Sequence, residues 1–193
     1  MLPVNIRFHS TLITKNYVYV CGGYNGTDTL NTVYTAPINS DGTLGTWVTA
    51  GNLPGPLRGS QVVAYVNKVY LLGGVNSSGY TSTVYTTTIN SDGTLGTWVT
   101  GTSLPINVDG SQIIVTQNRV YLLGGYNGTS VVSTVYTAPI YLDGTIGSWV
   151  TGTNLPVTLA WTQAIVTKNR VYLLGGMTSA ATYVSTVYTA AIS

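Results

Sequence analysis

Four short apolar runs, each closed by a pair of glycines, divide the sequence at regular intervals. Val-Tyr-Leu-Leu-Gly-Gly occupies 69–74, 120–125 and 171–176, and the variant Val-Tyr-Val-Cys-Gly-Gly occupies 18–23. Each run is too short for a helix and is bounded by turn residues, which predicts a β-strand covered on both faces. The first glycines of successive pairs are 51 residues apart. A fixed period of this length indicates one supersecondary unit, each copy burying its apolar face against the next.

Each repeat carries three further strand signals in a fixed order. A short apolar run and an asparagine turn precede the glycine-ended strand, which makes them the first strand of the repeat and its hairpin turn. After a polar loop, Thr-Val-Tyr-Thr predicts a third strand, since β-branched and aromatic residues favour strands. An Asp-Gly turn then leads to a fourth strand, which we expect to carry a tryptophan. The expected first strands are 11–14, 62–65, 113–116 and 164–167; the turn asparagines are Asn16, Asn67, Asn118 and Asn169; Thr-Val-Tyr-Thr lies at 32–35, 83–86, 134–137 and 186–189; the aspartates are Asp41, Asp92 and Asp143; and the tryptophans are Trp47, Trp98 and Trp149.

Four short antiparallel strands per repeat predict an all-β fold in which each repeat is one blade of a β-propeller. Leu-Pro pairs mark the linkers between repeats, because proline cannot donate to a strand ladder. The repeats are therefore expected at 1–52, 53–103, 104–154 and 155–193, in a single propeller or half-propeller domain spanning 1–193. No Asp-Gly turn or tryptophan follows the third strand of the last repeat. The fourth blade should lack its fourth strand, and the N-terminal residues offer no spare strand to replace it.

The paired glycines and the aromatic residues that follow them resemble the kelch repeat. Gly73, Gly74, Tyr85 and Trp98 show the pattern in one copy, and four copies in phase cover nearly the whole chain. The resemblance implies a β-propeller in which the first strand of each repeat lines the central channel and the fourth lies outermost. In related bacterial repeats an arginine and a histidine often precede the first strand. Here the arginine position holds Arg7, Arg58, Asp109 and Ala160, and the histidine position holds Ser10, Gln61, Gln112 and Gln163.

Kelch propellers usually have more blades than this chain has repeats, so the way in which the ring closes is open. One chain could close a four-bladed ring, or two chains could share an eight-bladed ring about a two-fold axis. An open array that pairs head to tail through the edge of the fourth blade is the third arrangement. We favour the homodimer, because blades of this size suit a wider ring than four would make.

Composition limits the partners and the location. Charged residues make up 6% of the chain and the net charge is +2, whereas nucleic-acid binding needs clustered basic charge. No apolar run approaches the roughly 18 to 20 residues that span a bilayer, and no signal-peptide apolar region is present. We therefore expect neither a nucleic-acid nor a membrane partner. Many Thr, Asn, Gly and Tyr residues with few charges favour an extracellular or surface protein, without fixing the location.

The residues that catalysis needs are scarce. His9 is the single histidine, so one chain cannot build a copper or zinc site of the usual ligand type. The single cysteine, Cys21, occupies a position that holds leucine in the other repeats, which indicates a buried apolar thiol. Asp41, Asp92 and Asp143 each precede a glycine, which is typical of a turn. We expect no cofactor, no metal and no enzymatic activity.

One face of the predicted blades varies from repeat to repeat, whereas the opposite face is repetitive. The linkers between repeats and the loops after the glycine pairs project from the variable face, which we call the loop face. Variable loops on a rigid scaffold are where binding usually resides. The candidate ligand-binding residues are Arg7, His9, Tyr24, Arg58, Gln61, Asp109, Gln112, Tyr126, Trp161 and Gln163.

Each candidate also has a structural interpretation. Trp161 stands where two other repeats have glycine, and it could plug the channel or form a stacking platform for a sugar or aromatic ligand. Arg7 and Arg58 could bind an anionic or hydroxylated ligand, or pair with Asp109 or a backbone carbonyl. The three glutamines could form a polar ring at the channel mouth or serve only in structural hydrogen bonds.

These observations predict a non-enzymatic binding or assembly scaffold that completes its ring by homodimerisation. A carbohydrate-binding lectin is the first alternative, because tyrosines, Trp161 and amide side chains suit stacking on sugars. A structural subunit of a larger oligomer or filament is the second. An enzyme would need metal ligands from a partner chain. The ligand, whether protein or glycan, is not identified by the sequence.

Overall fold

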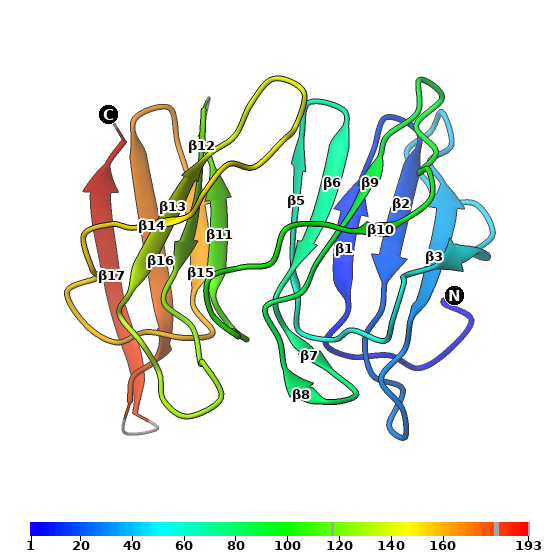
Figure 1. Ribbon diagram of the computed structural model, residues 1–193. Coiled ribbons are helices and arrows are strands. Elements are labelled where there is room, and N and C mark those ends of the chain that lie inside the picture. The colour runs from blue at the N-terminus through cyan, green and yellow to red at the C-terminus, as the bar shows by residue number, and fades with distance from the viewer. Residues whose placement is uncertain (117, 180–181, 193) are drawn as a thin grey trace. The chain divides into compact units, whose positions relative to one another are not determined.

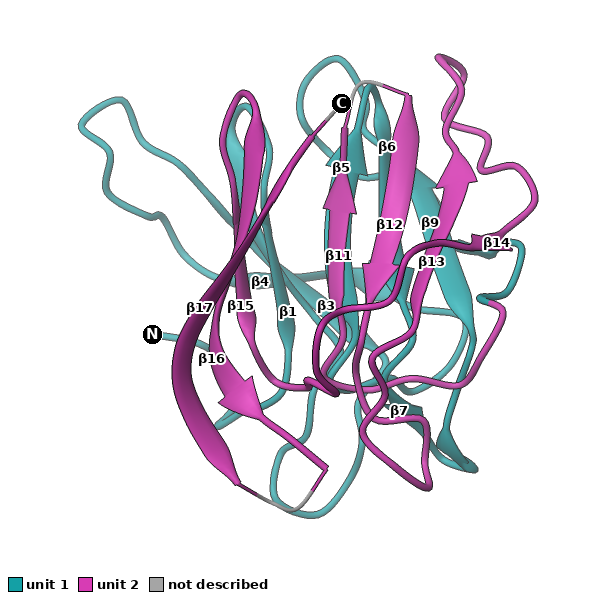
Figure 2. Cartoon of the chain, turned by 90° about the vertical axis from the view of Figure 1, so that its left-hand side faces the viewer, with its two compact units in different colours: residues 1–104 teal, residues 105–193 magenta. Residues whose placement is uncertain are grey.

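The computed structural model describes residues 1–116, 118–179 and 182–192 as strands, turns and loops, with no helix among them. The described residues therefore include no helix that is long and apolar enough to cross a membrane. The chain divides into two compact units, Met1–Leu104 and Pro105–Ser193 (Figure 2). The division falls within one residue of the predicted boundary between the second and third repeats, so each unit holds two repeats.

Unit 1 contains two four-stranded antiparallel sheets and one small hairpin. The first sheet follows chain order, β1-β2-β3-β4, and the second has the order β10-β9-β6-β5, with the hairpin β7-β8 inserted in a loop. The strands are β1 (Ser10–Ile13), β2 (Tyr17–Cys21), β3 (Thr32–Pro37), β4 (Val48–Asn52), β5 (Gln61–Tyr65), β6 (Lys68–Leu72), β7 (Val75–Asn76), β8 (Gly79–Tyr80), β9 (Val84–Thr88) and β10 (Val99–Thr100).

Unit 2 contains one four-stranded sheet, β11-β12-β13-β14, and one three-stranded sheet, β15-β16-β17, in which β17 is an edge strand (Figure 1). All pairs are antiparallel. The strands are β11 (Gln112–Val115), β12 (Arg119–Leu123), β13 (Val135–Pro139), β14 (Val150–Thr151), β15 (Gln163–Val166), β16 (Arg170–Met177) and β17 (Tyr183–Ala191). Among the described residues, the fourth repeat thus lacks a fourth strand, as predicted.

The all-β fold of propeller-type blades is confirmed, and two local predictions are wrong. Trp47, Trp98 and Trp149 each precede the fourth strand of their repeat by one residue and do not lie within it. In the turn of the second repeat, Val66, next to Asn67, has a positive φ of 54°.

The second wrong prediction concerns where the glycine-ended strand stops. In the fourth repeat the glycines do not end the strand, because β16 continues through Gly175 and Gly176 past a bulge that follows Leu174. The first strands also begin one residue earlier than expected.

The core of unit 1 lies between its two sheets. Buried side chains from β1 to β3 meet those of β6 and β9, and Trp98, which is 8% exposed, joins this cluster from the segment before β10. Cys21 is 1% exposed in the same cluster, where burial raises the pKa of its thiol to about 12. The cysteine is therefore a small core residue, as its position in the repeat predicted.

Candidate functional site

The linkers and the loops after the glycine pairs lie together in each unit, as the alternation of strand direction predicts. In unit 1, antiparallel backbone bridges join Arg7 to Tyr24 and Arg58 to Val75. In unit 2, equivalent bridges join Asp109 to Tyr126 and Ala160 to Met177. Each linker is therefore fixed against the loop of its own blade, and the side chains of the two segments share one surface.

In unit 1 this surface carries a cluster of two arginines and two aromatic rings, which we call the arginine cluster: Arg7, Phe8, Tyr24 and Arg58. The Arg7 guanidinium carbon lies 5.2 Å from the centroid of the Tyr24 ring and 5.2 Å from that of Phe8. The Arg58 guanidinium carbon lies 5.1 Å from the Tyr24 centroid. These distances are within the range of cation–π interactions. Tyr24 therefore holds two cationic groups that come from different blades.

Two polar atoms next to this cluster lack hydrogen-bond partners. Nε of Arg58 and Nδ1 of His9 are both buried and make no hydrogen bond. Buried polar atoms without partners are uncommon in folded proteins and invite an explanation, such as a bound ligand. Arg58 is half-buried, so its guanidinium lies partly inside the surface that a ligand would cover.

In unit 2 the corresponding surface carries the tryptophan cluster, which consists of Gly110, Tyr126 and Trp161. The rings of Tyr126 and Trp161 are stacked, with centroids 5.9 Å apart and planes 26° apart. A Cβ atom on Gly110 would lie 2.6 Å from Nε1 of Trp161, so the indole rests directly on this glycine. Trp161 is nevertheless 46% exposed, which leaves an aromatic surface open to solvent. Beside it, the carboxylate of Asp109 accepts a hydrogen bond of 2.8 Å from the Gly110 N–H.

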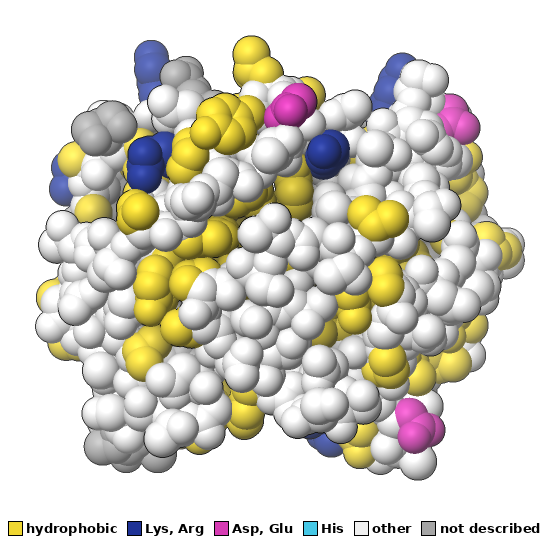
Figure 3. Space-filling model, in the orientation of Figure 1, with side chains coloured by type: hydrophobic (Ala, Val, Ile, Leu, Met, Phe, Trp, Pro, Cys, Tyr) yellow, Lys and Arg dark blue, Asp and Glu magenta, His cyan; other side chains and the backbone are white. Residues whose placement is uncertain are grey.

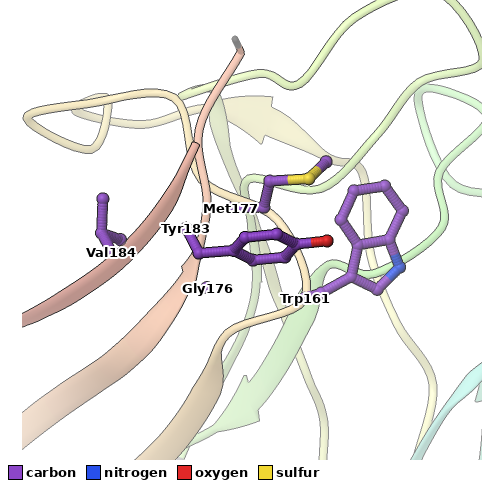
Figure 4. Close-up of a pocket in the computed structure, with 5 residues that line it drawn as sticks. All are labelled: Trp161, Gly176, Met177, Tyr183 and Val184. Atoms are coloured by element: carbon purple, nitrogen blue, oxygen red, sulfur yellow. The ribbon is translucent and has the colours of Figure 1, made fainter. Parts of the chain in front are cut away.

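A cavity of about 520 Å³ opens next to Trp161. It is lined by Trp161, Gly176, Met177, Tyr183 and Val184. Figure 4 shows the Tyr183 hydroxyl and the Met177 thioether pointing toward the indole, whereas Val184 points away. Its size and its aromatic lining are those of a site for a small ligand or a short peptide segment.

Phe8 and Trp161 occupy the same repeat position, and both have a left-handed backbone, with φ of 57° and 50°. Glycine fills this position in the other two repeats, with φ of 68° at Gly59 and 61° at Gly110. Glycine adopts this conformation freely, whereas a bulky residue pays about 1–2 kcal/mol. Strained residues of this kind cluster at functional sites. The two most exposed aromatic residues of the linkers are thus held where the backbone favours glycine.

Gln112 serves a structural role. Its Nε2 donates to the Thr162 carbonyl at 2.8 Å, and its Oε1 accepts from the Ala164 N–H at 3.1 Å, which joins β11 to β15. Ser10, the counterpart of Gln112 in unit 1, joins β1 to the next blade in the same way, with a 2.7 Å bond from Oγ to the Ser60 carbonyl. Among the predicted glutamines, Gln61 is half-buried and Gln163 is exposed.

The repeated aspartates support their turns, as predicted. Asp41 accepts bonds from both the backbone N–H and the hydroxyl of Thr43, at 2.9 and 2.6 Å. Asp92 makes the same pair of bonds with Thr94, and Asp143 accepts from the Thr145 N–H. The threonine hydrogen bonds hold the pKa values of Asp41 and Asp92 below the usual range. In the described part of the chain, no group of three or more His, Cys, Asp or Glu residues is placed to hold a metal ion.

The structure brings together the predicted residues of each unit and adds three that the sequence analysis missed. Phe8, Met177 and Tyr183 belong to the surface, although none was named as a candidate. The signal for Phe8 was present, since it replaces glycine at the position of Trp161. Met177 and Tyr183 carried no such signal, because their role depends on the extension of β16 and β17 past the glycine pair.

Comparison with known proteins agrees with this architecture. Residues 7–34 match the family model described as the Kelch motif. The Horsepox virus protein "Kelch repeat and BTB domain-containing protein 1" is 27% identical over 109 residues, which cover 56% of this chain and 18% of that protein. The solved structure entitled "Structure of YjhT" superposes with a TM-score of 0.75 at 16% identity, covering 97% of this chain and 63% of that one. The chain spans less than two thirds of either protein, and the structural likeness shows the fold alone.

The matched segment comprises the linker, the first two strands and the start of the third strand of one repeat. The three other repeats carry the same glycine pair in phase and the same third-strand tyrosine, which lies one residue late in the fourth repeat. They fold into antiparallel sheets of three or four strands. The first repeat therefore matches the kelch motif, and the other repeats share its sequence pattern and its antiparallel blade-like sheet.

Proposed function

We propose that this protein is a non-enzymatic binding scaffold that recognises its ligand through the loop face. The observation that carries the proposal is the placement of Phe8 and Trp161, two exposed aromatic residues at a backbone position that favours glycine. Kelch-repeat propellers commonly serve as protein-binding scaffolds, which agrees with this role. The carboxylates of Asp41, Asp92 and Asp143 accept hydrogen bonds within their own turns, so they are not available as the general acid and base of a catalytic site.

The chemistry of the two clusters indicates what such a ligand would contain. The arginine cluster offers guanidinium groups on an aromatic base, which suits a carboxylate next to an apolar or planar group. The tryptophan cluster offers a flat indole beside a cavity, which suits a planar or apolar side chain. A peptide with an acidic residue would suit the first cluster, and a peptide with an aromatic residue would suit the second.

Selection of peptides on the whole chain tests this proposal. A phage-displayed random peptide library is selected on the immobilised protein, and the affinity of each selected peptide is measured by calorimetry. We expect the Trp161→Ala variant to bind at least ~10-fold more weakly, as for an interface anchor. Leu142→Ala is the control, because Leu142 is exposed in a turn between the third and fourth strands of its repeat. Peptides that bind wild type and Trp161→Ala equally would overturn the proposal.

A lectin is the second candidate, and the stacked pair Tyr126 and Trp161 is the observation that favours it. Exposed aromatic faces bind the apolar faces of sugar rings, while hydroxyl and amide groups bind the sugar hydroxyls. An array of neutral and acidic oligosaccharides tests this candidate. Binding that disappears in Trp161→Ala supports a lectin, whereas an array without signal removes it and leaves peptide binding standing.

We also propose that the chain associates with itself, as a homodimer. The edge strand β17 supports this proposal, because an exposed edge is a template for pairing with another chain. Sedimentation at micromolar concentration tests it, with an expected mass of twice 20.3 kDa. A monomer over the whole concentration range would contradict it.

A further inference from the structure

All four linkers make the same backbone contact, although they carry different charges. The residue that pairs with the loop of its own blade is Arg7, Arg58, Asp109 or Ala160. Each forms two backbone hydrogen bonds of 2.8 to 3.0 Å across this bridge. Aspartate and alanine therefore support the bridge as arginine does, and the blade does not require a cation at this position. Both arginines nevertheless fall in unit 1, within the arginine cluster.

The two guanidinium groups of this cluster have no anionic partner in unit 1. Of the three aspartates of this unit, Asp41 and Asp92 are bonded within their own turns. Among the described residues of unit 1, Asp28 makes no ion pair with either arginine. The two guanidinium carbons still lie 5.2 and 5.1 Å from the same Tyr24 ring centroid. Two like charges that share one ring repel each other, and a bound anion would relieve this repulsion.

Unit 1 does not use the hydrogen-bond donors of these guanidinium groups. A cation–π contact uses the charge of a guanidinium and none of its five N–H donors. Neither arginine side chain donates a hydrogen bond within the described part of unit 1, and Nε of Arg58 is buried without a partner. The Tyr24 hydroxyl is occupied, since it donates to the Gly26 carbonyl at 2.9 Å. Tyr24 therefore positions the two cations, and their terminal N–H groups remain for an anion.

The two linkers that carry these arginines are joined to each other. The Gly59 N–H donates to the Phe8 carbonyl at 2.7 Å, so a hydrogen bond connects the residues next to both arginines. Gly74 permits the close packing of the second linker, because a Cβ there would collide with the Arg58 carbonyl oxygen. A site whose charged groups are positioned in advance loses less entropy on binding. Figure 3 shows a basic side chain beside apolar ones at its lower edge, on the side where Figure 1 places the β7-β8 hairpin of unit 1.

We propose that the arginine cluster binds an aryl phosphate, with the phosphate between the Arg7 and Arg58 guanidinium groups and the aryl ring against Phe8. A phosphate monoester carries a charge of about −1.5 to −2 at pH 7 and three strong acceptor oxygens, which match the N–H forks of two arginines. A carboxylate carries a single charge and would leave one arginine without a counter-ion. The Phe8 ring is 55% exposed beside Arg7 and offers an apolar surface to the aryl group. Such binding belongs to the proposed loop-face function, on which it rests, and makes an aryl phosphate the ligand of one of the two clusters.

Phenyl phosphate, phenyl sulfate and benzoate are the probes, because they present a dianion, a monoanion of similar shape and a carboxylate on the same ring. Each is titrated into the ¹⁵N-labelled full chain, and the Nε–H signals of the arginines are followed. We expect phenyl phosphate to bind saturably and at least ~10-fold more tightly than either monoanion, as for one additional charge-assisted contact. Equal affinities of the three probes, or no saturation by phenyl phosphate below roughly 10 mM, would overturn the proposal.

Variants of the chain locate the site. Arg7→Gln and Arg58→Gln should each weaken phenyl phosphate binding about 10-fold or more and reduce its preference over phenyl sulfate. Arg119→Gln is the matched control, because it removes the same charge from unit 2, where Nε of Arg119 donates to Oγ1 of Thr137 at 3.0 Å. This variant should bind phenyl phosphate as the wild type does. Equal losses in the three variants would show attraction by net charge alone and would overturn the assignment of Arg7 and Arg58 to the site.

Two further measurements separate the outcomes. A capped Gly-Gly-Tyr-Gly-Gly peptide phosphorylated on tyrosine should bind more tightly than phenyl phosphate if the source is a protein and more weakly if it is a small molecule, and either result supports an aryl phosphate. Failure of phenyl phosphate to bind, while selected peptides still lose affinity in Trp161→Ala, would overturn the phosphate site and leave the loop-face function standing. Arginine-dependent binding of phenyl phosphate without any Trp161-dependent peptide would support the phosphate site and remove peptide recognition by the tryptophan cluster.

Discussion

The indole of Trp161 rests on the backbone of Gly110, the residue two repeats after Phe8. The backbone N–H of Trp161 donates to the Gly110 carbonyl at 2.7 Å, and a Cβ on Gly110 would lie 2.6 Å from Nε1 of the indole and 2.7 Å from Cδ1. The glycine therefore leaves room for the ring and also supplies a backbone acceptor. In unit 2, the tryptophan at this linker position of one blade is thus accommodated by the glycine at the same position of the preceding blade.

Gly110→Ala should displace the indole from Tyr126. The added methyl group collides with the ring, and φ of +61° costs an alanine about 1–2 kcal/mol. We expect the Trp161 indole N–H signal to move in a ¹⁵N correlation spectrum and the unfolding free energy to fall by about 1–2 kcal/mol. Gly26→Ala is the control, since φ is +105° there and nothing lies within 4 Å of the new Cβ. An unmoved Trp161 signal in Gly110→Ala would contradict the contact.

Trp161→Gly should change stability little, in contrast to the loss of a core tryptophan. Glycine relieves the left-handed strain of about 1–2 kcal/mol, while the variant loses aromatic stacking worth about 0.5–1.5 kcal/mol and gains chain entropy when unfolded. These effects nearly cancel, so urea unfolding should show a change within about 1 kcal/mol. A loss above about 3 kcal/mol, the size typical of a core tryptophan, would mean that Trp161 serves packing and would remove the main support for a loop-face site.

The fold was predictable from the sequence because the period repeats the signals of the first three strands four times and those of the fourth strand three times. The alternation of strand direction also placed the linkers and the loops after the glycine pairs on one face, and the backbone bridges from Arg7 to Tyr24 and from Asp109 to Tyr126 agree with it. The position of each tryptophan one residue before its strand was not predictable. It depends on Trp98 packing toward the neighbouring sheet, which a pattern within one repeat does not record.

Side-chain contacts between blades could not be predicted from the sequence. Arg58 reaches Tyr24 from the next blade, and their approach depends on the rotation between two sheets, which the repeat period does not specify. The role of Gln112 was open for the same reason, because its partners, Thr162 and Ala164, lie in the following repeat.

Cys21 should make stability depend on pH at alkaline values. Burial raises the pKa of its thiol to about 12 from an ordinary value of 9.0, so between these values the unfolded chain loses the proton first. The stabilising contribution is complete below about pH 9 and declines as pH rises toward 12. Urea unfolding at a series of pH values measures this decline.

Cys21→Ala isolates the part of the decline that belongs to the thiol. Burial also raises the pKa values of Tyr19 and Tyr85, which adds a loss of the same sign above pH 10 in both proteins. The difference between wild type and Cys21→Ala should therefore shrink between pH 9 and 12. A difference that stays constant over this range would contradict the buried thiol, as would rapid reaction of the folded protein with a disulfide reagent at pH 8.

Trp98→Ala should strongly destabilise the chain, because it opens a cavity in the core between the two sheets of unit 1. Trp98 is 8% exposed within the core cluster, and loss of a buried tryptophan costs about 3–5 kcal/mol. Trp47→Ala is the matched control: Trp47 is the equivalent residue of the first repeat, is only half-buried and should cost less. Urea unfolding followed by circular dichroism measures both variants.

Since a cavity lined by apolar groups binds small apolar molecules, free indole should raise the unfolding midpoint of Trp98→Ala and leave that of Trp47→Ala unchanged. Equal costs for the two variants, or no response to indole, would show that Trp98 does not act as the wedge between the two blades of unit 1.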